Sequence, residues 1–277
     1  MLGPAHATSG AALWLAGAAL WQHTGHHVDL PVVLVGAAVC AGAALLPDLD
    51  HPGSLSTRDG ATAVRAFGPL GEAVGHTLSA ASLAIYNGTR GHRDPVKTGG
   101  HRTFTHTVAF AVLAGVAAWL GCMSSAPVGF AGRTWAAGQL VGLGLMWAML
   151  HLALIGLGEK QVKRARSRWG LLGVFALSGA VTAATAYFLP PAHGYPWLGP
   201  TVAAGCLAHL AGDAITKAGV PALWPMRVRG RRWYDVALPG MLRVDAGGVM
   251  ANLVVPGVLV AVGVASLAAL ILPAARA

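Results

Sequence analysis

The chain has 277 residues, of which 55% are hydrophobic and only 10% are charged. Soluble globular domains usually contain about 25% charged residues, so this composition excludes an ordinary soluble protein and indicates one that crosses a membrane several times. The formal net charge of +9 favours contact with anionic lipid headgroups. The three cysteines, Cys40, Cys122 and Cys206, are isolated within apolar runs, so neither a disulfide framework nor a thiolate zinc site is indicated.

Seven apolar segments predict an all-α polytopic membrane protein with about seven transmembrane helices, in one domain over residues 1–277. Their approximate bounds are 8–21, 31–47, 105–122, 134–157, 170–189, 197–216 and 249–273. Several approach the ~20 residues that cross ~30 Å of hydrocarbon, although the first two are short. No basic region precedes the first segment and no small-residue cleavage site follows it, so we expect a retained span rather than a signal peptide.

Lys and Arg residues are concentrated in three of the connecting segments. Residues 53–104, 158–169 and 217–248 contain 17 of the 19. The positive-inside rule places these segments in the cytoplasm. Seven spans that start from a cytoplasmic N-terminus put all three on that side and the C-terminus outside. We therefore predict a multi-pass protein of the inner (plasma) membrane.

Two cytoplasmic segments are predicted to carry structure of their own. Within the insertion at 61–104, residues 61–89 are helix-rich but too polar for an eighth span, so we expect an interfacial or half-buried helix. In the basic segment at 217–248, arginines alternate from Arg227 to Arg231, which favours an extended strand. A return strand over 236–244 would complete a small cytoplasmic β-hairpin.

Acidic and imidazole side chains gather at the predicted cytoplasmic ends of the spans. They are His6 before the first span, Asp48, Asp50 and His51 after the second, His101 and His106 before the third, and His209 and Asp213 near the inner end of the sixth. An ionisable residue costs ~2.5–3.5 kcal/mol near the centre of a bilayer, so such residues are functional by default. Because they come from distant parts of the chain and reach one depth, we predict that Asp48, Asp50, His101, His106, His209 and Asp213 lie within one compact metal site, with His6 and His51 as further candidate ligands.

Local sequence predicts how the first cluster is presented. Pro47 and Pro52 bracket it, and the residue before a proline is restricted away from the α region, so we expect an extended chain. Asp48 and Asp50 would then share a face, while His51 points elsewhere or reaches a second metal ion.

The two histidine motifs are expected at helix boundaries or within a helix. His101 and His106 flank a helix start, with Thr103 or Thr105 as the predicted N-cap. In the sixth span, Asp213 follows His209 by four residues, so the two side chains share one face of a helix. An intramembrane ion pair or a proton relay remains an alternative for that pair.

Three motifs in this order resemble the YdjM-like family of LexA-regulated, inner-membrane-associated proteins described as metal-dependent hydrolases. They are LLPDLDHPGS at 45–54, HRTFTHT at 101–107 and HLAGDAITKAGVPALWPMR at 209–227, together with AHATSG near the N-terminus. The resemblance covers most of the chain and implies a helical membrane protein with a hydrolytic metal centre. The His-x-x-x-Asp pattern is also similar to the zinc-dependent phospholipase C group, which implies phosphoester cleavage.

The ligand chemistry predicts a hydrolase. A mixed Asp and His set suits one or two divalent ions, Zn²⁺ first and Mn²⁺ or Fe²⁺ as alternatives. Such an ion lowers the pKa of bound water from about 15.7 towards about 7. Asp50 and Asp213 are the candidate general bases, and Arg102, Arg227 and Arg229 are the candidate phosphate-binding residues. The expected substrate is a phosphoester of a lipid or another amphiphilic molecule, cleaved at the cytoplasmic face.

Two other classes of function are consistent with the sequence. An ion- or proton-coupled transporter would use the intramembrane Asp and His residues, although its site would be expected near the midplane between internal repeats, which we do not find. A non-catalytic scaffold would use a closed metal site to join helices. Expected partners are membrane lipids with anionic headgroups and the amphiphilic substrate, with no nucleic acid. The sequence leaves the oligomeric state open.

Overall fold

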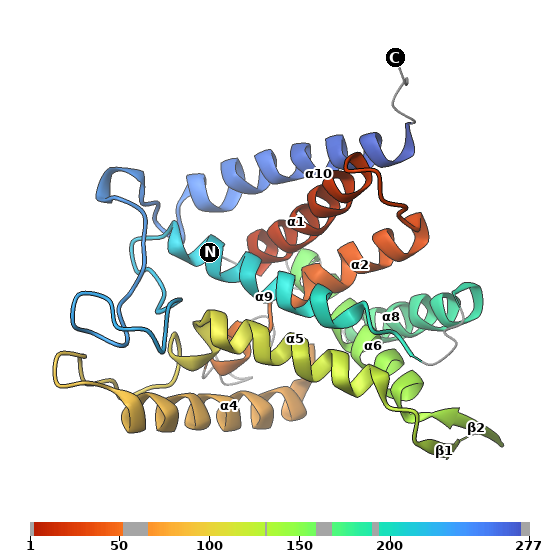
Figure 1. The fold of residues 1–277 in the computed structure, drawn as a ribbon, viewed down its shortest axis with the longest axis horizontal. Helices are drawn as coiled ribbons and strands as arrows, with labels where there is room; N and C mark the ends of the chain where they lie inside the picture. The colour runs from red at the N-terminus through yellow and green to blue at the C-terminus, as the bar shows by residue number, and fades with distance from the viewer. Residues whose placement is uncertain (1–2, 52–65, 131, 159–167, 190–193, 273–277) are drawn as a thin grey trace.

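The protein is mostly helical, as the sequence predicts. The computed structural model describes residues 3–51, 66–130, 132–158, 168–189 and 194–272 (Figure 1). Its α-helices are α1 (Gly3–His23), α2 (Leu30–Ala43), α4 (Gly68–Thr89), α5 (Val108–Met123), α6 (Ala137–Leu157), α8 (Arg168–Phe188), α9 (Leu198–Ala214) and α10 (Val255–Ile271). Short 3₁₀ turns lie at η1 (Pro47–Asp50), η2 (Phe104–His106) and η3 (Gly240–Leu242), and a π-helical turn, η4 (Met250–Val254), precedes α10.

Helix α2 lies at the centre of the bundle, where it contacts α1, α6 and α9. Helix α5 packs on α9 and α6, while α10 lies against α1 and α8 against α6. Figure 1 shows α10 along the top of the molecule and α4 along the bottom. The outer faces of α8 and α10 expose large apolar side chains such as Phe175 and Val264. In a membrane protein these faces are suited to contact with lipid.

Four helical segments of the described chain are long and apolar enough to cross a membrane. They are Leu30–Asp50, Ala137–Leu157, Gly170–Phe188 and Met250–Ile271. A helix occupies each of the seven predicted apolar segments, but α5 and α9 have only 16 and 17 residues. These lengths fall short of the ~20 residues that a bilayer requires. Seven crossings and their orientation therefore stay predictions.

The helix expected within residues 61–89 is α4, and residues 52–65 lie outside the described chain. Helix α4 packs against both η1 and η2, the turns that carry acidic and histidine residues. The backbone at Gly100 lies so close to α4 that a Cβ atom there would come within 1.9 Å of the Ser79 carbonyl oxygen. This close approach fixes the loop before η2 on the helix.

The two-stranded sheet forms in a different place from the predicted hairpin. Strands β1 (Pro127–Phe130) and β2 (Arg133–Ala136) pair antiparallel in the segment between α5 and α6. This segment lies far along the chain from residues 227–244. The sheet is therefore not the hairpin that the arginine pattern predicted.

The expected hairpin over 227–244 is absent from the described chain, which has only isolated bridges there. Its arginine alternation is interrupted by a tight turn. Arg229 and Gly230 both have positive φ, 51° and 79°, and the backbones of Val228 and Arg231 exchange hydrogen bonds of 2.9 and 3.0 Å around them. Two successive positive φ values are typical of a two-residue reverse turn. Arg229 therefore lies at a turn rather than within a strand.

Candidate metal centre

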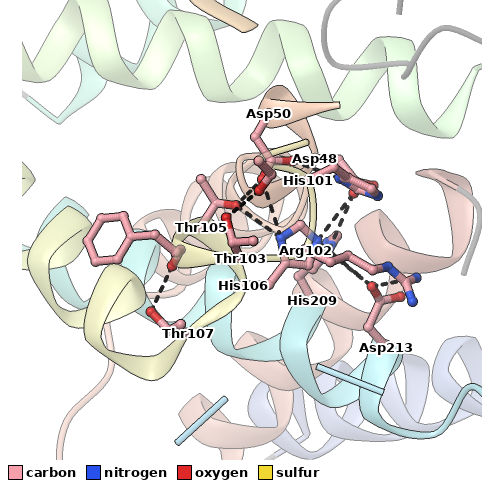
Figure 2. A network of polar contacts seen from close by, with 12 residues as sticks. Asp48, Asp50, His101, Arg102, Thr103, Thr105, His106, Thr107, His209 and Asp213 are labelled. Carbon is pink, nitrogen blue, oxygen red and sulfur yellow. Dashed lines mark hydrogen bonds and ion pairs between the residues drawn. The ribbon is translucent and has the colours of Figure 1, made fainter. Parts of the chain in front are cut away.

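Acidic and imidazole side chains from four distant parts of the chain meet in one region. Figure 2 shows those from three of the parts, which contribute Asp48 and Asp50, His101 and His106, and His209 and Asp213. Two groups of three each have ligand atoms within 4.8 Å of one another, His6 with His209 and Asp213, and Asp48 with His101 and His106. A direct contact joins the groups, because the Nε2 atoms of His106 and His209 are 3.2 Å apart. We call the following set the acid–histidine cluster: His6, Asp48, Asp50, His101, His106, His209 and Asp213.

Two glycines allow the helices that carry this cluster to approach closely. A Cβ atom at Gly10 of α1 would lie 2.5 Å from the Cys40 carbonyl oxygen of α2, and one at Gly205 of α9 would lie 2.6 Å from the same oxygen. Any larger residue would push α1 or α9 away from α2. With both glycines in place, the rings of His6 and His209 stack with centroids 3.9 Å apart. Close packing of the three helices therefore positions two of the imidazoles.

The first acidic motif is a 3₁₀ turn, so the prediction of an extended chain was wrong. Pro47 opens η1, a position where its fixed φ suits a helical turn. Residues two apart in a 3₁₀ helix, with three residues per turn, do not share a face. Asp48 accordingly lies with its Oδ1 atom 3.6 Å from His106 Nε2 and 3.7 Å from His209 Nε2. Asp50 faces the other ring nitrogen of His106, with 3.8 Å between its Oδ2 atom and Nδ1.

Asp50 is fully buried and holds two residues of the histidine motif. Its Oδ1 atom accepts a hydrogen bond of 2.8 Å from His101 Nδ1, and its Oδ2 atom accepts one from the hydroxyl of Thr105. The Thr105 oxygen in turn lies 3.0 Å from His106 Nδ1. Asp50 therefore orients two imidazoles. Sequence reasoning considered Thr105 only as a helix cap and missed this contact.

The N-cap of α5 is a later threonine than the two predicted. Thr107, rather than Thr103 or Thr105, accepts the hydrogen bond from the backbone N–H of Phe110, at 3.1 Å. His106 consequently lies in η2 and precedes the helix instead of belonging to its first turn. The turn directs its ring into the cluster, where it is completely buried.

Hydrogen bonds fix the proton positions on the two facing imidazoles. His209 Nδ1 lies 2.8 Å from the carbonyl oxygen of Ala44, which can only accept, so Nδ1 carries the proton and Nε2 has a lone pair. The Thr105 hydroxyl gives its hydrogen to Asp50, so its oxygen accepts from His106 Nδ1. His106 Nε2 then also has a lone pair. Two lone pairs at 3.2 Å repel each other unless a cation lies between them.

The donor separations test whether a metal ion fits this position. Besides the 3.2 Å contact and the two distances to Asp48, Asp213 Oδ2 lies 3.9 Å from His106 Nε2 and 3.8 Å from His209 Nε2. A tetrahedral site with bonds of about 2.0–2.1 Å has edges of about 3.3–3.4 Å. The five separations span 3.2–3.9 Å, so small movements would bring Asp48, His106, His209 and Asp213 around one ion. The His and Asp groups could therefore hold a metal ion.

Asp213 also interacts with two other members of the site. Its Oδ1 atom lies 3.3 Å from His6 Nε2, and its Oδ2 atom lies 2.8 Å from Arg102 Nη2. His6 is almost fully buried, and its Nδ1 atom has no hydrogen-bond partner among the described residues. A buried polar atom without a partner is costly, and a bound ion would relieve that cost. His6 is thus available as a further ligand.

Three predicted site residues lie at the margin or outside the cluster. His51 packs edge-on against His101, with ring centroids 4.6 Å apart, and burial together with His101 lowers the pKa of His51. Arg227 and Arg229 are exposed, and Arg229 lies over the ring of Tyr234, 5.6 Å from its centroid. Among the described residues, the arginine that forms an ion pair with the cluster is Arg102.

Comparison with known families identifies the chain. Its sequence matches the family described as YdjM inner membrane protein over residues 1–154 and 170–273. The chain belongs to this family. The resemblance seen in the three motifs is thereby confirmed, and the matched residues include the whole acid–histidine cluster. Curated proteins give no match, and neither do solved structures. This YdjM family member is therefore an inner membrane protein with buried His and Asp groups that could hold a metal ion.

Proposed function

We propose that this protein is a membrane-bound, metal-dependent hydrolase that cleaves a phosphoester of a lipid or another amphiphilic substrate at the cytoplasmic face. The observation that carries the proposal is the pair of facing imidazole nitrogens, His106 Nε2 and His209 Nε2, with carboxylate oxygens of Asp48 and Asp213 at 3.7 and 3.8 Å from His209 Nε2. Neutral imidazoles and carboxylates are the ligands of catalytic zinc sites. We expect the site to bind one or two zinc ions, with manganese or iron as alternatives.

The ligand roles follow from the separations. Asp48, His106, His209 and Asp213 would hold the ion, with His6 as a further donor. A bound divalent ion supplies a Lewis acid and lowers the pKa of a coordinated water. The buried Asp50, which was a candidate base, is assigned to orientation because both of its oxygens are already hydrogen bonded.

Proton transfer is assigned to His101. Its side chain is 28% exposed, so it is the most accessible imidazole in the cluster, and its Nδ1–H donates to Asp50 at 2.8 Å. The carboxylate fixes the tautomer and the orientation of the ring, so the other ring nitrogen has a lone pair. His101 Nε2 can therefore accept a proton from the attacking water and return it to the leaving group.

A panel of phosphoesters and amides tests the proposal. In purified protein loaded with zinc, Asp213→Asn should reduce phosphoester hydrolysis by about 10³-fold, which corresponds to about 4 kcal/mol of barrier. Asp245→Asn is the matched control, because Asp245 is exposed and pairs with Lys217 at 2.7 Å. A parent protein that binds zinc stoichiometrically but hydrolyses nothing in the panel would contradict the proposal.

One observation favours a second candidate function. A proton shared between His106 and His209 would satisfy the two facing lone pairs as a metal ion would, and buried His and Asp residues form proton relays in transporters. A proton-coupled transporter predicts pH-driven flux in proteoliposomes, without hydrolysis and without metal. A non-catalytic scaffold predicts metal-dependent thermal stability with neither activity.

A further inference from the structure

Two cationic side chains of the loop between α4 and η2 lie at the edge of the acid–histidine cluster. Arg102 reaches Asp213, with 2.8 Å between Nη2 and Oδ2, and its side chain is 24% exposed. Lys97 Nζ donates a hydrogen bond of 2.9 Å to the backbone carbonyl of Arg102. Both side chains are partly buried, and Lys97 is tied to the backbone of Arg102, beside the predicted metal ligands.

We propose that Lys97 and Arg102 together form an oxyanion-binding site that holds the phosphoryl group of a phosphate ester. Sequence reasoning selected Arg102 but not Lys97, and it selected Arg227 and Arg229, which lie elsewhere. The inference rests on the proposed function, because it adds the substrate's anionic group to the same site. It makes the recognised class a phosphate monoester or diester, of lipid or soluble origin.

The loop that carries the two cations is firmly anchored. Tyr86 is fully buried in α4, and its hydroxyl donates a hydrogen bond of 2.6 Å to the Pro95 carbonyl. The buried Asp94 accepts from the backbone N–H groups of Gly91, at 2.7 Å, and Trp233, at 3.1 Å. These contacts tie the loop to α4 on one side and to the basic segment on the other. Binding groups that are held in place lose less entropy when a ligand binds.

The Lys97 ammonium is held in position over the ring of Tyr86. Its Nζ atom lies 5.3 Å from the centroid of the Tyr86 ring, and burial lowers the pKa of Lys97. A desolvated ammonium interacts more strongly with an anion than one in water does. An ammonium group has three donors, and the Arg102 carbonyl is the one hydrogen-bond acceptor found for Lys97 in the described chain. Two donors are therefore available to a ligand.

Arg102 has an unusual backbone conformation for a residue that is not glycine. Its φ angle is 55°, in the left-handed region, and the Lys97 ammonium binds the carbonyl of this same residue. Non-glycine residues in that region are strained and concentrate at functional sites. The conformation turns the guanidinium towards Asp213. A guanidinium has five N–H donors in a planar fork, so contact with Asp213 leaves others that can bind phosphate oxygens.

The carboxylate of Asp235 would compete with a bound phosphate for Lys97 and Arg102. Its carboxylate attracts both Lys97 and Arg102 from the neighbouring basic segment, although it is itself exposed. A phosphate group would carry up to two negative charges to the same pair of cations. Removing the Asp235 charge should therefore favour phosphate binding, whereas removing either cation should weaken it.

Phosphate titration of the purified full-length protein tests the inference. The protein is first titrated with zinc and dialysed, and inorganic phosphate binding is then measured by calorimetry. Lys97→Gln and Arg102→Gln should each weaken phosphate binding at least tenfold, about 1.4 kcal/mol, and Asp235→Asn should strengthen it. Arg229→Gln is the matched control and should change the affinity less than twofold. Lys97→Arg, which keeps the charge, should restore most of the binding.

The outcomes separate this inference from the proposed function. Equal losses in Arg229→Gln and Lys97→Gln would indicate a general basic surface and overturn the site, as would unchanged affinity in both Gln variants of the pair. A protein that takes up no zinc but binds phosphate through Lys97 would refute the metal centre and support the anion site. Melting temperatures of the variants, measured in parallel, show whether a lost affinity reflects unfolding.

Competition identifies the source of the phosphate. Glycerol 3-phosphate displaces inorganic phosphate if the site takes soluble esters. Lysophosphatidic acid in detergent micelles displaces it if the site takes lipid headgroups. Either competitor supports the site when Lys97→Gln abolishes its effect, whereas competition that is the same in parent and variant overturns it.

Discussion

Arg102 and Asp213 form an ion pair of 2.8 Å at the oxygen that also faces the imidazoles of His106 and His209. The carboxylate is buried, whereas the arginine is 24% exposed. The guanidinium thus supplies a positive charge next to the position that the donor set offers to a metal ion. It stabilises the buried carboxylate without metal, and it also repels an incoming cation.

The first prediction concerns this dual effect. Arg102→Gln should lower the melting temperature of the metal-free protein, because loss of one partner from a buried pair leaves a charge uncompensated. The same change should tighten zinc binding by about tenfold, or about 1.4 kcal/mol, since it removes the repulsion. Melting curves with chelator and with zinc measure both effects. Weaker zinc binding in the variant would indicate that Arg102 orients Asp213 for the metal instead of competing with it.

A second prediction concerns the carboxylate behind the imidazoles. Asp50→Asn replaces one acceptor oxygen by an NH₂ group, which cannot accept a hydrogen bond. The one remaining oxygen cannot serve both His101 and Thr105 as the two carboxylate oxygens do. Outer partners of metal ligands typically contribute about 10–100-fold to metal affinity. We expect a loss of that size, measured by competition with a coloured chelator, while the helical circular dichroism stays unchanged. Asp245→Asn should have no effect, and an unchanged affinity in Asp50→Asn would remove Asp50 from the site.

Part of the site could be predicted from residue types and their depth. His209 and Asp213 are ionisable groups inside an apolar run, and such groups rarely lie there without a partner. The role of Asp50 could not be predicted, because Pro47 is compatible with both an extended chain and the first residue of a 3₁₀ turn. In an extended chain the side chains of Asp48 and Asp50 would share a face, whereas the 3₁₀ turn directs them to different faces. Lys97 was missed because a single loop lysine has no sequence signature.

The fold was predicted to a similar extent. Apolar runs gave the seven helices, since hydrophobic segments of that length need no long-range information. The sheet was assigned to the wrong segment, because the arginine alternation around Arg229 is compatible with a strand until the positive φ of that residue is known. The close approach of α1 and α9 to α2 depends on Gly10 and Gly205, and glycine in an apolar helix does not by itself identify its neighbour.

The third prediction tests that helix packing. Gly205→Ala places a Cβ atom 2.5 Å from Ala43 Cβ and 2.6 Å from the Cys40 carbonyl oxygen. Overpacking of this kind costs about 1–3 kcal/mol, and it should also weaken zinc binding because it moves His209. Gly17→Ala in α1 is the control, because no atom lies within 4 Å of its added Cβ and alanine favours a helix. A Gly205→Ala protein with unchanged melting temperature and zinc affinity would show that the helices separate without cost.

The last prediction concerns orientation. The charge distribution places Arg229 in the cytoplasm and the β1–β2 hairpin outside, and both Arg229 and Arg133 are exposed. The three native cysteines are buried, so they provide a low background for labelling. In intact cells, an impermeant maleimide should therefore react with the Arg133→Cys protein and should react with Arg229→Cys only after permeabilisation. The reverse pattern would place the acid–histidine cluster at the external face, where a cytoplasmic substrate could not reach it.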